Sequence, residues 1–320
     1  MEQIKRYGFG IDLGGTTCKI GLFSAEGDLL DKWAIPTDTS DGGSRILKNI
    51  AESLDQKLME KKIPKTAVFG AGIGVPGAVT DDGIVNRCVN LGWGVFPIEE
   101  EFSALTGLYI AAGNDANVAA LGENFRGSGR GCESIVMVTL GTGIGGGIVL
   151  HNRILTGHNG AAGEIGHIVV NPQETETCGC GNHGCIEQYA SATGIARLAR
   201  RYLKEHPNEA TVLRDDPRLS AKTVFDAAKK DDDAANAVVN EVCSLLGHML
   251  AVVANVVNPE AIVIGGGVSK AGDILIDRLM PSFHRDLFHA CKNTKVVLAS
   301  LGNDAGIYGG ARLVLPDEEM

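Results

Sequence analysis

Three cysteines and two histidines lie close together in the sequence, and these residue types bind metal ions. Cys178, Cys180 and Cys185 fall within eight residues and are interleaved with glycines. His167 lies upstream of them and His183 lies among them. One histidine and three cysteines suit tetrahedral Zn²⁺, and a site closed by four protein ligands is structural. The pattern therefore predicts a structural zinc site whose fourth ligand is His167 or His183, and it disfavours a set of free surface thiols.

Two carboxylates border this cysteine group. Glu164 stands three residues before His167, and Glu187 stands two residues after Cys185. Carboxylate oxygens accept hydrogen bonds, and the hydroxyl groups of a sugar are abundant donors. We therefore interpret Glu164 and Glu187 as candidate contacts to a sugar. The alternative for each is a solvated surface charge.

Two glycine-rich turns follow apolar, strand-like segments. The first is Asp12-Leu13-Gly14-Gly15-Thr16-Thr17 and the second is Gly141-Thr142-Gly143-Ile144-Gly145-Gly146-Gly147. Glycine allows backbone N–H groups to approach a phosphate, threonine hydroxyls add donors, and an aspartate at a strand end holds Mg²⁺, usually through water. One Gly-Gly turn alone would indicate an ordinary hairpin, but the recurrence of the pattern favours two phosphate-binding turns.

A third glycine run, Gly265 to Gly267, follows a buried strand-like segment and precedes a predicted helix. This placement suits the close approach of an adenosine or a ribose. A plain strand-to-helix turn explains the glycines equally well.

The second glycine-rich turn also matches the dinucleotide-binding fingerprint, through Gly141, Gly143 and Gly146. That fingerprint requires a helix directly after the glycines. The residues that follow, Gly147 to Leu150, predict a strand instead, which disfavours a nicotinamide site. The sequence also contains no G-x-x-x-x-G-K-[ST] motif, which excludes a P-loop enzyme.

Asn114 and Asp115 mark the boundary between an apolar run at 108–112 and a helix predicted from Ala116. An aspartate at the end of a strand can act as a general base that takes a proton from a substrate hydroxyl. An aspartate in front of a helix can equally be an N-cap that accepts backbone hydrogen bonds. Spacing alone does not separate these two interpretations.

Hydrophobic periodicity indicates the elements that must position these residues. Strands are predicted over Tyr7–Leu13, Cys18–Phe23, Leu29–Ile35, Val68–Val75, Ile135–Leu140, Ile148–Leu150, Ala261–Ile264 and Lys295–Ser300. Helices are predicted from a cap at Ser44 to a stop at Pro64, and over Glu187–His206, Ala221–Lys230 and Ala234–Asn258. Each half of the chain thus carries an apolar strand, a Gly/Thr turn and a second strand.

The composition is that of a soluble globular protein of one large or two ordinary domains, with 320 residues, 44% hydrophobic and 21% charged. A net charge of −10 opposes binding to nucleic acid or to anionic membranes. The polar N-terminus predicts no signal peptide, and polar residues within 234–258 predict a buried helix there, not a membrane span. Of eight cysteines, five are scattered singly, which favours a metal site in a reducing, cytoplasmic compartment over disulfides.

Together, five segments resemble the motifs of the ROK family (repressors, open reading frames and kinases), and most closely those of its bacterial glucokinases. These segments are Asp12 to Thr17, Asn114-Asp115, Leu140 to Gly147, Glu164 to His167 and Cys178 to Glu187. The resemblance covers residues 8–313, and its Cys-x-Cys-Gly-x-x-Gly-Cys-x-Glu segment is highly specific. It implies an α/β, two-domain, actin-like (ribonuclease H-like) fold with ATP and sugar in the interdomain cleft. The implied domains are residues 1–115, joined by a C-terminal helix at 304–320, and residues 116–303 with the zinc loop.

The resemblance also implies a role for each motif. Asp115 would be the catalytic base for the 6-hydroxyl of glucose, with ATP and Mg²⁺ as phosphate donor. The sugar contacts would be Gly77, Asn90, Asn114, Asp115, Glu164, His167 and Glu187. The nucleotide contacts would be Asp12, Gly14, Gly15, Thr16, Thr17, Lys19, Gly141, Thr142, Gly143, Gly265, Gly266 and Gly267. Structural Zn²⁺ would be held by His167, Cys178, Cys180 and Cys185, and the protein would form a homo-oligomer.

Other functions fit the sequence less well. Repressors of this family carry a DNA-binding helix-turn-helix before the first strand, whereas about six residues precede that strand here, and the acidic charge opposes DNA binding. A non-catalytic sugar sensor is disfavoured by the presence of Asp115 and of the phosphate turns. Kinases for fructose, mannose, allose or N-acetylmannosamine share these motifs, but the resemblance to glucokinases is closest at Asn90-Leu91-Gly92-Trp93 and at Leu140 to Gly147.

Overall fold

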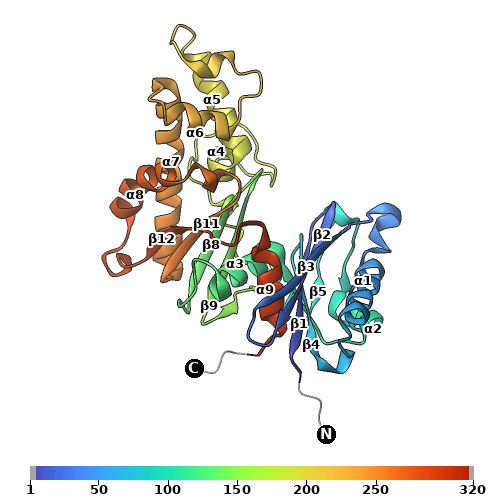
Figure 1. The fold of residues 1–320 in the computed structure, drawn as a ribbon. Coiled ribbons are helices and arrows are strands. Elements are labelled where there is room, and N and C mark those ends of the chain that lie inside the picture. The colour runs from blue at the N-terminus through green and yellow to red at the C-terminus, as the bar shows by residue number, and fades with distance from the viewer. Residues whose placement is uncertain (1–4, 317–320) are drawn as a thin grey trace. The chain divides into compact units, whose positions relative to one another are not determined.

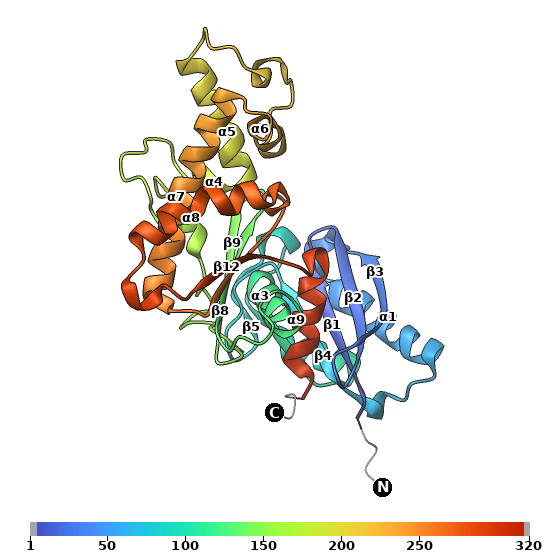
Figure 2. The same ribbon diagram turned by 60° about the vertical axis from the view of Figure 1, so that its left-hand side comes forward.

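The computed structural model describes residues 5–316 and divides into two compact units (Figures 1 and 2). Unit 2 comprises Ser134–Gly146 and Glu164–Ala299, and unit 1 comprises the rest of the described chain. The chain therefore passes from one unit to the other at residues 133/134, 146/147, 163/164 and 299/300.

This division differs from the boundary expected at residues 115/116. Helix α3 (Asp115–Arg126) and residues 147–163 belong to unit 1 because they pack with its other elements. The predicted C-terminal helix is α9 (Ala305–Val314), which also lies in unit 1. Residues 317–320 of that prediction lie outside the described residues.

A five-stranded sheet in the order β3-β2-β1-β4-β7 forms the centre of unit 1. Its strands are β1 (Tyr7–Leu13), β2 (Thr17–Ser24), β3 (Leu29–Pro36), β4 (Val68–Val75) and β7 (Ile110–Asn114). β1, β4 and β7 are parallel neighbours, with Asp12 opposite Gly74 and Val75 opposite Asn114. Their carboxyl ends meet at one edge of the sheet, which gathers Asp12, the residues after Val75 and the Asn114-Asp115 pair.

Glycine alternates with apolar residues along β1 and β4, and this pattern decides which helices cover each face. The helices concerned are α1 (Ile46–Lys61), α2 (Ile98–Thr106) and α9. Phe9 and Ile11 share a core with α1 and α2. On the other face, a Cβ atom at Gly10 or Gly72 would collide with the backbone of α9. Glycine at these positions therefore lets α9 lie directly on the sheet.

Unit 2 is built on three parallel strands, of which β11 is the middle one. They are β8 (Ile135–Leu140), β11 (Ala261–Gly265) and β12 (Lys295–Leu298). The helices are α4 (Glu187–Ala190), α5 (Ala192–Glu205), α6 (Ala221–Ala228), α7 (Asp233–Val257) and α8 (Asp273–Asp286). Gly265 pairs with Thr139, so the turns after β8 and β11 meet at one edge of the sheet.

Four further strands complete the fold of the described residues. β9 (Ile144–Leu150) begins in unit 2 and continues into unit 1, where it pairs with β10 (Arg153–Ile154). In unit 1, β5 (Ile84–Val85) and β6 (Phe96–Pro97) form an antiparallel pair. The predicted strand after the second glycine-rich turn is confirmed, at the place where the dinucleotide-binding fingerprint has a helix.

Several predicted boundaries were wrong. Helix α1 begins at Ile46 after Arg45, so Ser44 is not its cap. The helix predicted over 187–206 breaks at Ser191, which has a ψ of 163° and caps α5 by accepting the N–H of Gly194. The run Gly265 to Gly267 opens a short 3-10 turn, Val268–Ala271, and the α-helix starts only at Asp273.

One helix of the described residues is long and apolar enough to cross a membrane by length and composition. This helix is α7, whose most apolar window has a mean hydropathy of 1.7 and is 61% buried inside the protein. Leu246, Met249 and Leu250 of this helix are fully buried. Its apolar character is thus accounted for by core packing, as expected for a buried helix.

Candidate functional site

Asp12 and Lys19 form an ion pair at the carboxyl edge of the unit 1 sheet. Nζ of Lys19 donates to Oδ2 of Asp12 at 3.1 Å and to the carbonyl oxygen of Asn303 at 3.1 Å. A Cβ atom at Gly306 would lie 2.7 Å from Cγ of Asp12, so glycine lets the start of α9 sit against this carboxylate. The side chains of Lys19 and Asp12 are 35% and 25% exposed, which leaves both charges accessible to a ligand.

The first glycine-rich turn connects β1 and β2. The N–H of Gly14 donates to the carbonyl oxygen of Thr17 at 3.1 Å, and Oγ1 of Thr37 donates to the carbonyl oxygen of Gly14 at 2.7 Å. Gly15, Thr16 and Thr17 are exposed. Hydrogen bonds therefore hold the turn in shape while the residues at its tip are exposed to solvent, an arrangement that suits the binding of an anion.

The structure separates the two interpretations of the Asn114-Asp115 pair. Oδ1 of Asn114 accepts the N–H groups of Ala116 at 3.0 Å and Asn117 at 3.2 Å, so Asn114 is the N-cap of α3. Asp115 is the first residue of the helix, and its Oδ1 accepts the N–H of Ala116 at 2.8 Å. The capping function thus belongs to Asn114 and leaves Asp115 available for chemistry.

Asp115 also has the acidity of a general base. Burial raises its pKa from 3.8 to about 6, against the lowering effect of the Ala116 amide, and the charge of Asp12 adds to the rise. A carboxylate that titrates near neutral pH accepts a proton from a hydroxyl more readily than an ordinary aspartate does.

Gly77 and Asn90 are the other predicted sugar contacts of unit 1. Nδ2 of Asn114 donates to the carbonyl oxygen of Gly77 at 3.2 Å, which ties the segment after β4 to the Asn114-Asp115 pair. A Cβ atom at Gly77 would lie 2.8 Å from the carbonyl oxygen of Arg87. Asn90 lies in a 3-10 turn, Val89–Leu91, and is exposed to solvent.

Four of the five candidate metal ligands come together in unit 2. The ligand atoms of His167, Cys178, Cys180 and Cys185 all lie within 4.8 Å of one another. The Sγ atoms of Cys180 and Cys185 are 3.7 Å apart, and Sγ of Cys178 lies 3.8 Å from Nδ1 of His167. Bonds of about 2.3 Å to a tetrahedral zinc give ligand separations of about 3.8 Å, so these residues fit Zn²⁺. His183 lies outside the group, so the geometry favours His167 over His183 as the fourth ligand.

The imidazole of His167 has different neighbours on its two sides. Its Nδ1 faces Cys178, and its Nε2 lies 3.9 Å from Oε2 of Glu164. The Glu164 side chain is 64% exposed and that of His167 is 31% exposed. One ring nitrogen can therefore hold a metal while the other side meets a ligand together with Glu164.

Glu187 links the metal group to the second glycine-rich turn. Its Oε2 accepts the N–H of Ile144 at 2.8 Å, and its Oε1 lies 3.9 Å from Sγ of Cys178. A Cβ atom at Gly143 would collide with Oε2 of Glu187, so this close approach requires glycine. Glu187 is half-buried and paired, and is not a solvated surface charge.

Gln188, which no sequence motif singled out, supports the metal loop through hydrogen bonds to its backbone. Its Oε1 accepts the N–H groups of Gly184 at 2.8 Å and Cys185 at 3.2 Å, and its Nε2 donates to the carbonyl oxygen of Glu176 at 2.9 Å. Because one side chain satisfies three backbone groups of the loop, it holds Cys185 in its place within the metal group.

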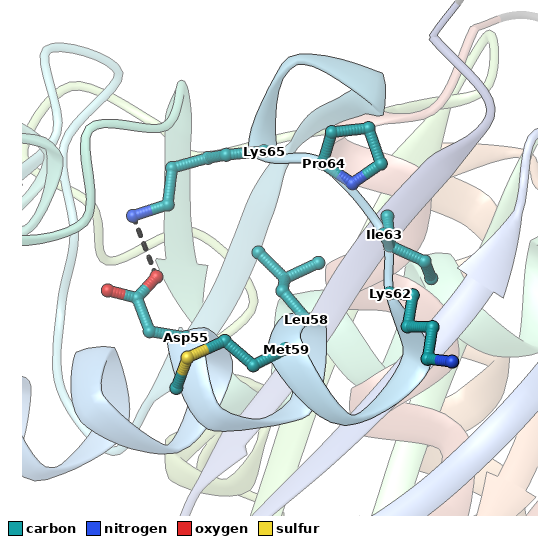
Figure 3. A pocket seen from close by; sticks show the side chains of 7 residues that line it. All are labelled: Asp55, Leu58, Met59, Lys62, Ile63, Pro64 and Lys65. Atoms are coloured by element: carbon teal, nitrogen blue, oxygen red, sulfur yellow. Dashed lines mark ion pairs between the residues drawn. The ribbon is translucent and has the colours of Figure 1, made fainter.

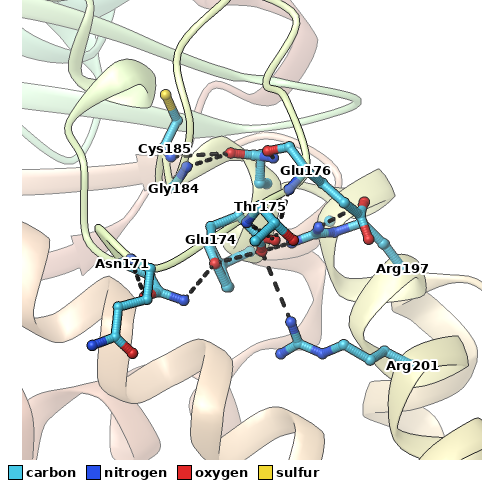
Figure 4. Close-up of polar contacts among 12 residues, drawn as sticks. Asn171, Glu174, Thr175, Glu176, Gly184, Cys185, Arg197 and Arg201 are labelled. Atoms are coloured by element: carbon cyan, nitrogen blue, oxygen red, sulfur yellow. Dashed lines mark hydrogen bonds and ion pairs between the residues drawn. The ribbon is translucent and has the colours of Figure 1, made fainter.

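An ion-pair network centred on Glu174 adjoins the loop before the cysteines (Figure 4). Glu174, whose side chain is 6% exposed, accepts hydrogen bonds from the hydroxyl of Tyr189 at 2.6 Å and from Arg197 at 3.0 Å, and Arg201 lies 3.8 Å away. Although burial opposes the shift, these hydrogen bonds lower the pKa of Glu174 to about 2. The loop before the cysteines is thereby fastened to α4 and α5.

The N-terminus of α5 holds the second glycine-rich turn. The N–H of Ala192 donates to the carbonyl oxygen of Gly141 at 2.8 Å, and Oγ1 of Thr193 donates to that of Thr142 at 2.7 Å. The Ser191 cap positions both donors, and a serine after an apolar residue was the sequence signal that could have revealed it. Thr142 itself is exposed, as the tip of a phosphate-binding turn should be.

A cavity of about 310 Å³ opens beside Gly267 in unit 2. Its walls come from α6, from the 3-10 turn Val268–Ala271 and from Ala192, with Phe225 among the lining residues. A Cβ atom at Gly266, which has a φ of +85°, would lie 2.5 Å from the carbonyl oxygen of Leu140. The cavity combines apolar walls with the polar groups of Ser220, Asp226 and Lys270, a lining suited to a heteroaromatic ring and a ribose.

Two larger cavities of the described residues lie in unit 1, and neither is lined by a residue singled out from the sequence. One, of about 580 Å³, lies at the end of α1, where Lys65 forms an ion pair of 2.7 Å with Asp55 (Figure 3). The other, of about 600 Å³, is lined in part by Phe125, His151 and Arg312. Size alone does not identify a catalytic site, because chemistry requires converging reactive groups.

Known proteins match this chain along almost its whole length. Residues 8–317 match the sequence model of the ROK family. A glucokinase of Halalkalibacterium halodurans is 45% identical, with 98% of this chain and 96% of the relative covered. A glucokinase of Thermotoga maritima is 38% identical, with 95% and 96% covered. The crystal structure of a ROK family glucokinase from Streptomyces griseus in complex with glucose and AMPPNP has a TM-score of 0.73 and 32% identity, with 96% of this chain and 99% of that chain covered.

These matches agree with the architecture of the two units. Both are mixed α/β structures, and the ROK sugar kinases that they match have the actin-like ATPase fold. The predicted fold class is therefore confirmed, and the chain belongs to the ROK family.

Proposed function

We propose that this protein transfers the γ-phosphoryl group of ATP to the 6-hydroxyl of glucose. The observation that carries the proposal is Asp115, which begins α3 without serving as its cap and has a pKa raised to about 6. Asp12 and the first phosphate turn lie at the same edge of the sheet. The identity to glucokinases supports glucose as the acceptor.

The groups of unit 1 act on the reacting atoms in this proposal. Phosphoryl transfer depends on positioning and on charge stabilisation more than on covalent chemistry. Asp115 orients the 6-hydroxyl and accepts its proton late, while Asn114 and the backbone at Gly77 hold neighbouring hydroxyls. The amides of the Gly14–Thr17 turn and the ammonium of Lys19 face the phosphates. Asp12 would hold Mg²⁺ through water, and this ion neutralises phosphate charge when bound.

The groups of unit 2 hold the sugar and the nucleotide. Glu164, His167 and Glu187 accept or donate hydrogen bonds to the remaining sugar hydroxyls. Zinc at His167 and the three cysteines is structural, because four protein ligands leave no coordination position for a substrate. Its contribution is to keep His167 and Glu187 in place.

The rate should depend on the protonation state of Asp115. A general base works only when ionised, so kcat/KM for glucose should be constant above about pH 7 and fall about tenfold per pH unit below about pH 6. The pH profile of ADP release, measured with saturating MgATP, tests this. A rate that rises on acidification through the pKa of about 6 would contradict the role of Asp115.

The cavity beside Gly267 is proposed to take the adenine ring of ATP. Filling it with Ala271→Leu should raise KM for ATP at least about tenfold and leave KM for glucose within about twofold, because only the nucleotide loses contact area. Asp277→Leu, which adds the same side chain on an exposed position of α8 outside the cavity, is the matched control. Equal effects of the two substitutions on KM for ATP would place the adenine elsewhere.

A panel of hexoses tests the proposed function itself. ADP release would be measured with zinc-loaded protein and MgATP against glucose, mannose, fructose, allose and N-acetylmannosamine. The highest kcat/KM is expected with glucose. Turnover with another hexose alone would support the same mechanism with that hexose as the substrate. No turnover with any hexose would favour a sugar sensor.

The cysteines also indicate the cellular compartment of the protein. The eight cysteines are free, and three of them form the metal group. Zinc binding requires reduced thiolates, so we place the protein in the reducing cytoplasm.

A further inference from the structure

Helix α3 carries three buried polar side chains after Asp115. Asn117, Glu123 and Asn124 are 2%, 0% and 7% exposed, and Glu123 is the one carboxylate among the buried polar residues of the described chain. A buried carboxylate is unfavourable unless hydrogen bonds replace its lost hydration. The carboxylate of Glu123 must therefore accept hydrogen bonds from nearby donors.

The carboxylate of Glu123 accepts hydrogen bonds from three backbone amides. Oε2 accepts the N–H groups of Ser128 at 2.9 Å and Ser300 at 3.2 Å, and Oε1 accepts that of Leu301 at 2.8 Å. The hydroxyl of Ser300 lies 3.5 Å from Oε2. A Cβ atom at Gly127 would collide with the same carboxylate, so the chain closes tightly around it.

Two of these amides stand where the chain returns to unit 1. Ala299 is the last residue of unit 2, and Ser300 begins the final segment of unit 1. The N–H of Ala299 donates to the carbonyl oxygen of Ile264 in β11 at 2.9 Å, whereas the next two amides donate to Glu123. Consecutive peptide groups are thus hydrogen-bonded within different units, so the 299/300 crossing is held on both sides.

The neighbouring residue on α3 anchors a second crossing. Nδ2 of Asn124 donates to the carbonyl oxygen of Cys132 at 2.7 Å, just before the chain leaves unit 1 after residue 133. On the other side of this crossing, the N–H of Ser134 donates to Oε1 of Glu260 at 3.1 Å. The unit 1 ends of two crossings are therefore attached to one helix.

We propose that Glu123 is a positioning residue for phosphoryl transfer, a role that rests on the proposed kinase function. Asp115 and Glu123 stand eight residues apart on one helix, which is about 12 Å along its axis. The helix therefore fixes the distance between the base and the point where the chain arrives from unit 2. Unit 1 carries the first phosphate turn, and unit 2 carries the second turn and the cavity proposed for adenine. ATP would therefore contact groups of both units, and a loose anchor at Glu123 would make the placement of its phosphates less reproducible.

Glu123→Gln tests this role at nearly constant volume. Both carboxylate oxygens accept backbone N–H groups. In either orientation of the glutamine amide, its NH₂ group would therefore face a backbone N–H and could not accept a hydrogen bond from it. The amides of Ser300 and Leu301 should exchange with deuterium at least about tenfold faster, and kcat with glucose and MgATP should fall by about ten- to a hundredfold. KM for glucose should stay within about twofold, because its contacts are untouched.

Leu121→Ala on the same helix is the matched control, since Leu121 is buried at 4% exposure in the core. At a temperature where each variant is folded, it should keep kcat within about twofold despite a lower Tm. The proposal is overturned by unchanged exchange at Ser300 and Leu301 in Glu123→Gln, by an unchanged kcat, or by a loss of kcat that Leu121→Ala shares. A wild-type protein without kinase activity would refute the proposed function instead, while the exchange data would still report on the anchor.

Discussion

Replacing Asp115 by asparagine should lower kcat by about 10²–10⁴-fold and leave the dissociation constant for glucose within about threefold. The carboxamide keeps the size of the side chain and an acceptor oxygen, but it does not take the proton of the 6-hydroxyl. ADP release gives kcat, and titration calorimetry gives the dissociation constant. An equal loss of affinity and rate would identify Asp115 as a binding residue.

Glu99→Gln is the matched control for this substitution. Glu99 is another carboxylate of unit 1 whose pKa is raised by burial, and its Oε1 accepts the N–H of Ala112 in β7 at 2.8 Å. It is not among the proposed catalytic or binding residues. The variant should keep kcat within about threefold, which would show that the loss in Asp115→Asn comes from base chemistry and not from removing a buried charge.

Asp115→Asn should also stabilise the folded protein above neutral pH. The pKa of Asp115 is higher in the folded state, about 6, than its ordinary value of 3.8. The stability contributed by the protonated group is complete below pH 3.8 and is lost as the pH rises through 6. Asparagine avoids this loss, which is on the order of 2–3 kcal/mol for such a shift. The Tm difference between variant and wild type should therefore grow between about pH 4 and pH 7.

Removing zinc should lower thermal stability and glucose affinity together. Structural zinc contributes roughly 10–16 kcal/mol in isolated zinc-finger peptides. Gln188 and Glu174 also hold the loop here, so we expect a smaller effect, a Tm lower by about 10 °C. The dissociation constant for glucose should rise at least about tenfold, because the loop positions His167 and Glu187. An unchanged Tm in metal-free protein would refute a structural zinc.

Single substitutions identify the ligands independently of chelation. Cys180→Ser and His167→Ala should each lose bound zinc, measured by native mass spectrometry, and should show the lower Tm of the metal-free protein. Cys132→Ser, which removes a cysteine outside the metal group, is the control for the first. His183→Ala is the control for the second and should retain one zinc per chain. Loss of zinc in His183→Ala alone would exchange the roles of the two histidines.

The parts of the site that depend on local sequence could be predicted. The cysteine spacing predicted the metal group because its three cysteines lie within eight residues, and the structure brings them together with His167. Gly143 and Glu187 were singled out separately, and the structure explains both by their mutual contact. The strands β1 and β4 were predicted with their observed bounds, because their apolar runs end in glycine or proline.

The parts that depend on distant partners could not be predicted. The choice between Asp115 as helix cap and Asp115 as general base depends on side-chain geometry that spacing does not contain, because Asn114 turned out to be the cap. Nothing in the sequence around Glu123 distinguishes it from an exposed glutamate of an amphipathic helix. Its partners Ser300 and Leu301 are more than 170 residues away in the sequence. The choice between His167 and His183 also required the folded loop, because both lie near the cysteines in sequence.

Transfer of labelled phosphate from [γ-³²P]ATP to glucose and to 6-deoxyglucose tests whether this protein phosphorylates the 6-hydroxyl. The two sugars differ only in the hydroxyl that Asp115 is proposed to deprotonate. We expect labelled glucose 6-phosphate from zinc-loaded protein, no label on 6-deoxyglucose, and competitive inhibition by 6-deoxyglucose. Label on 6-deoxyglucose, or none on glucose, would contradict phosphorylation at the 6-hydroxyl.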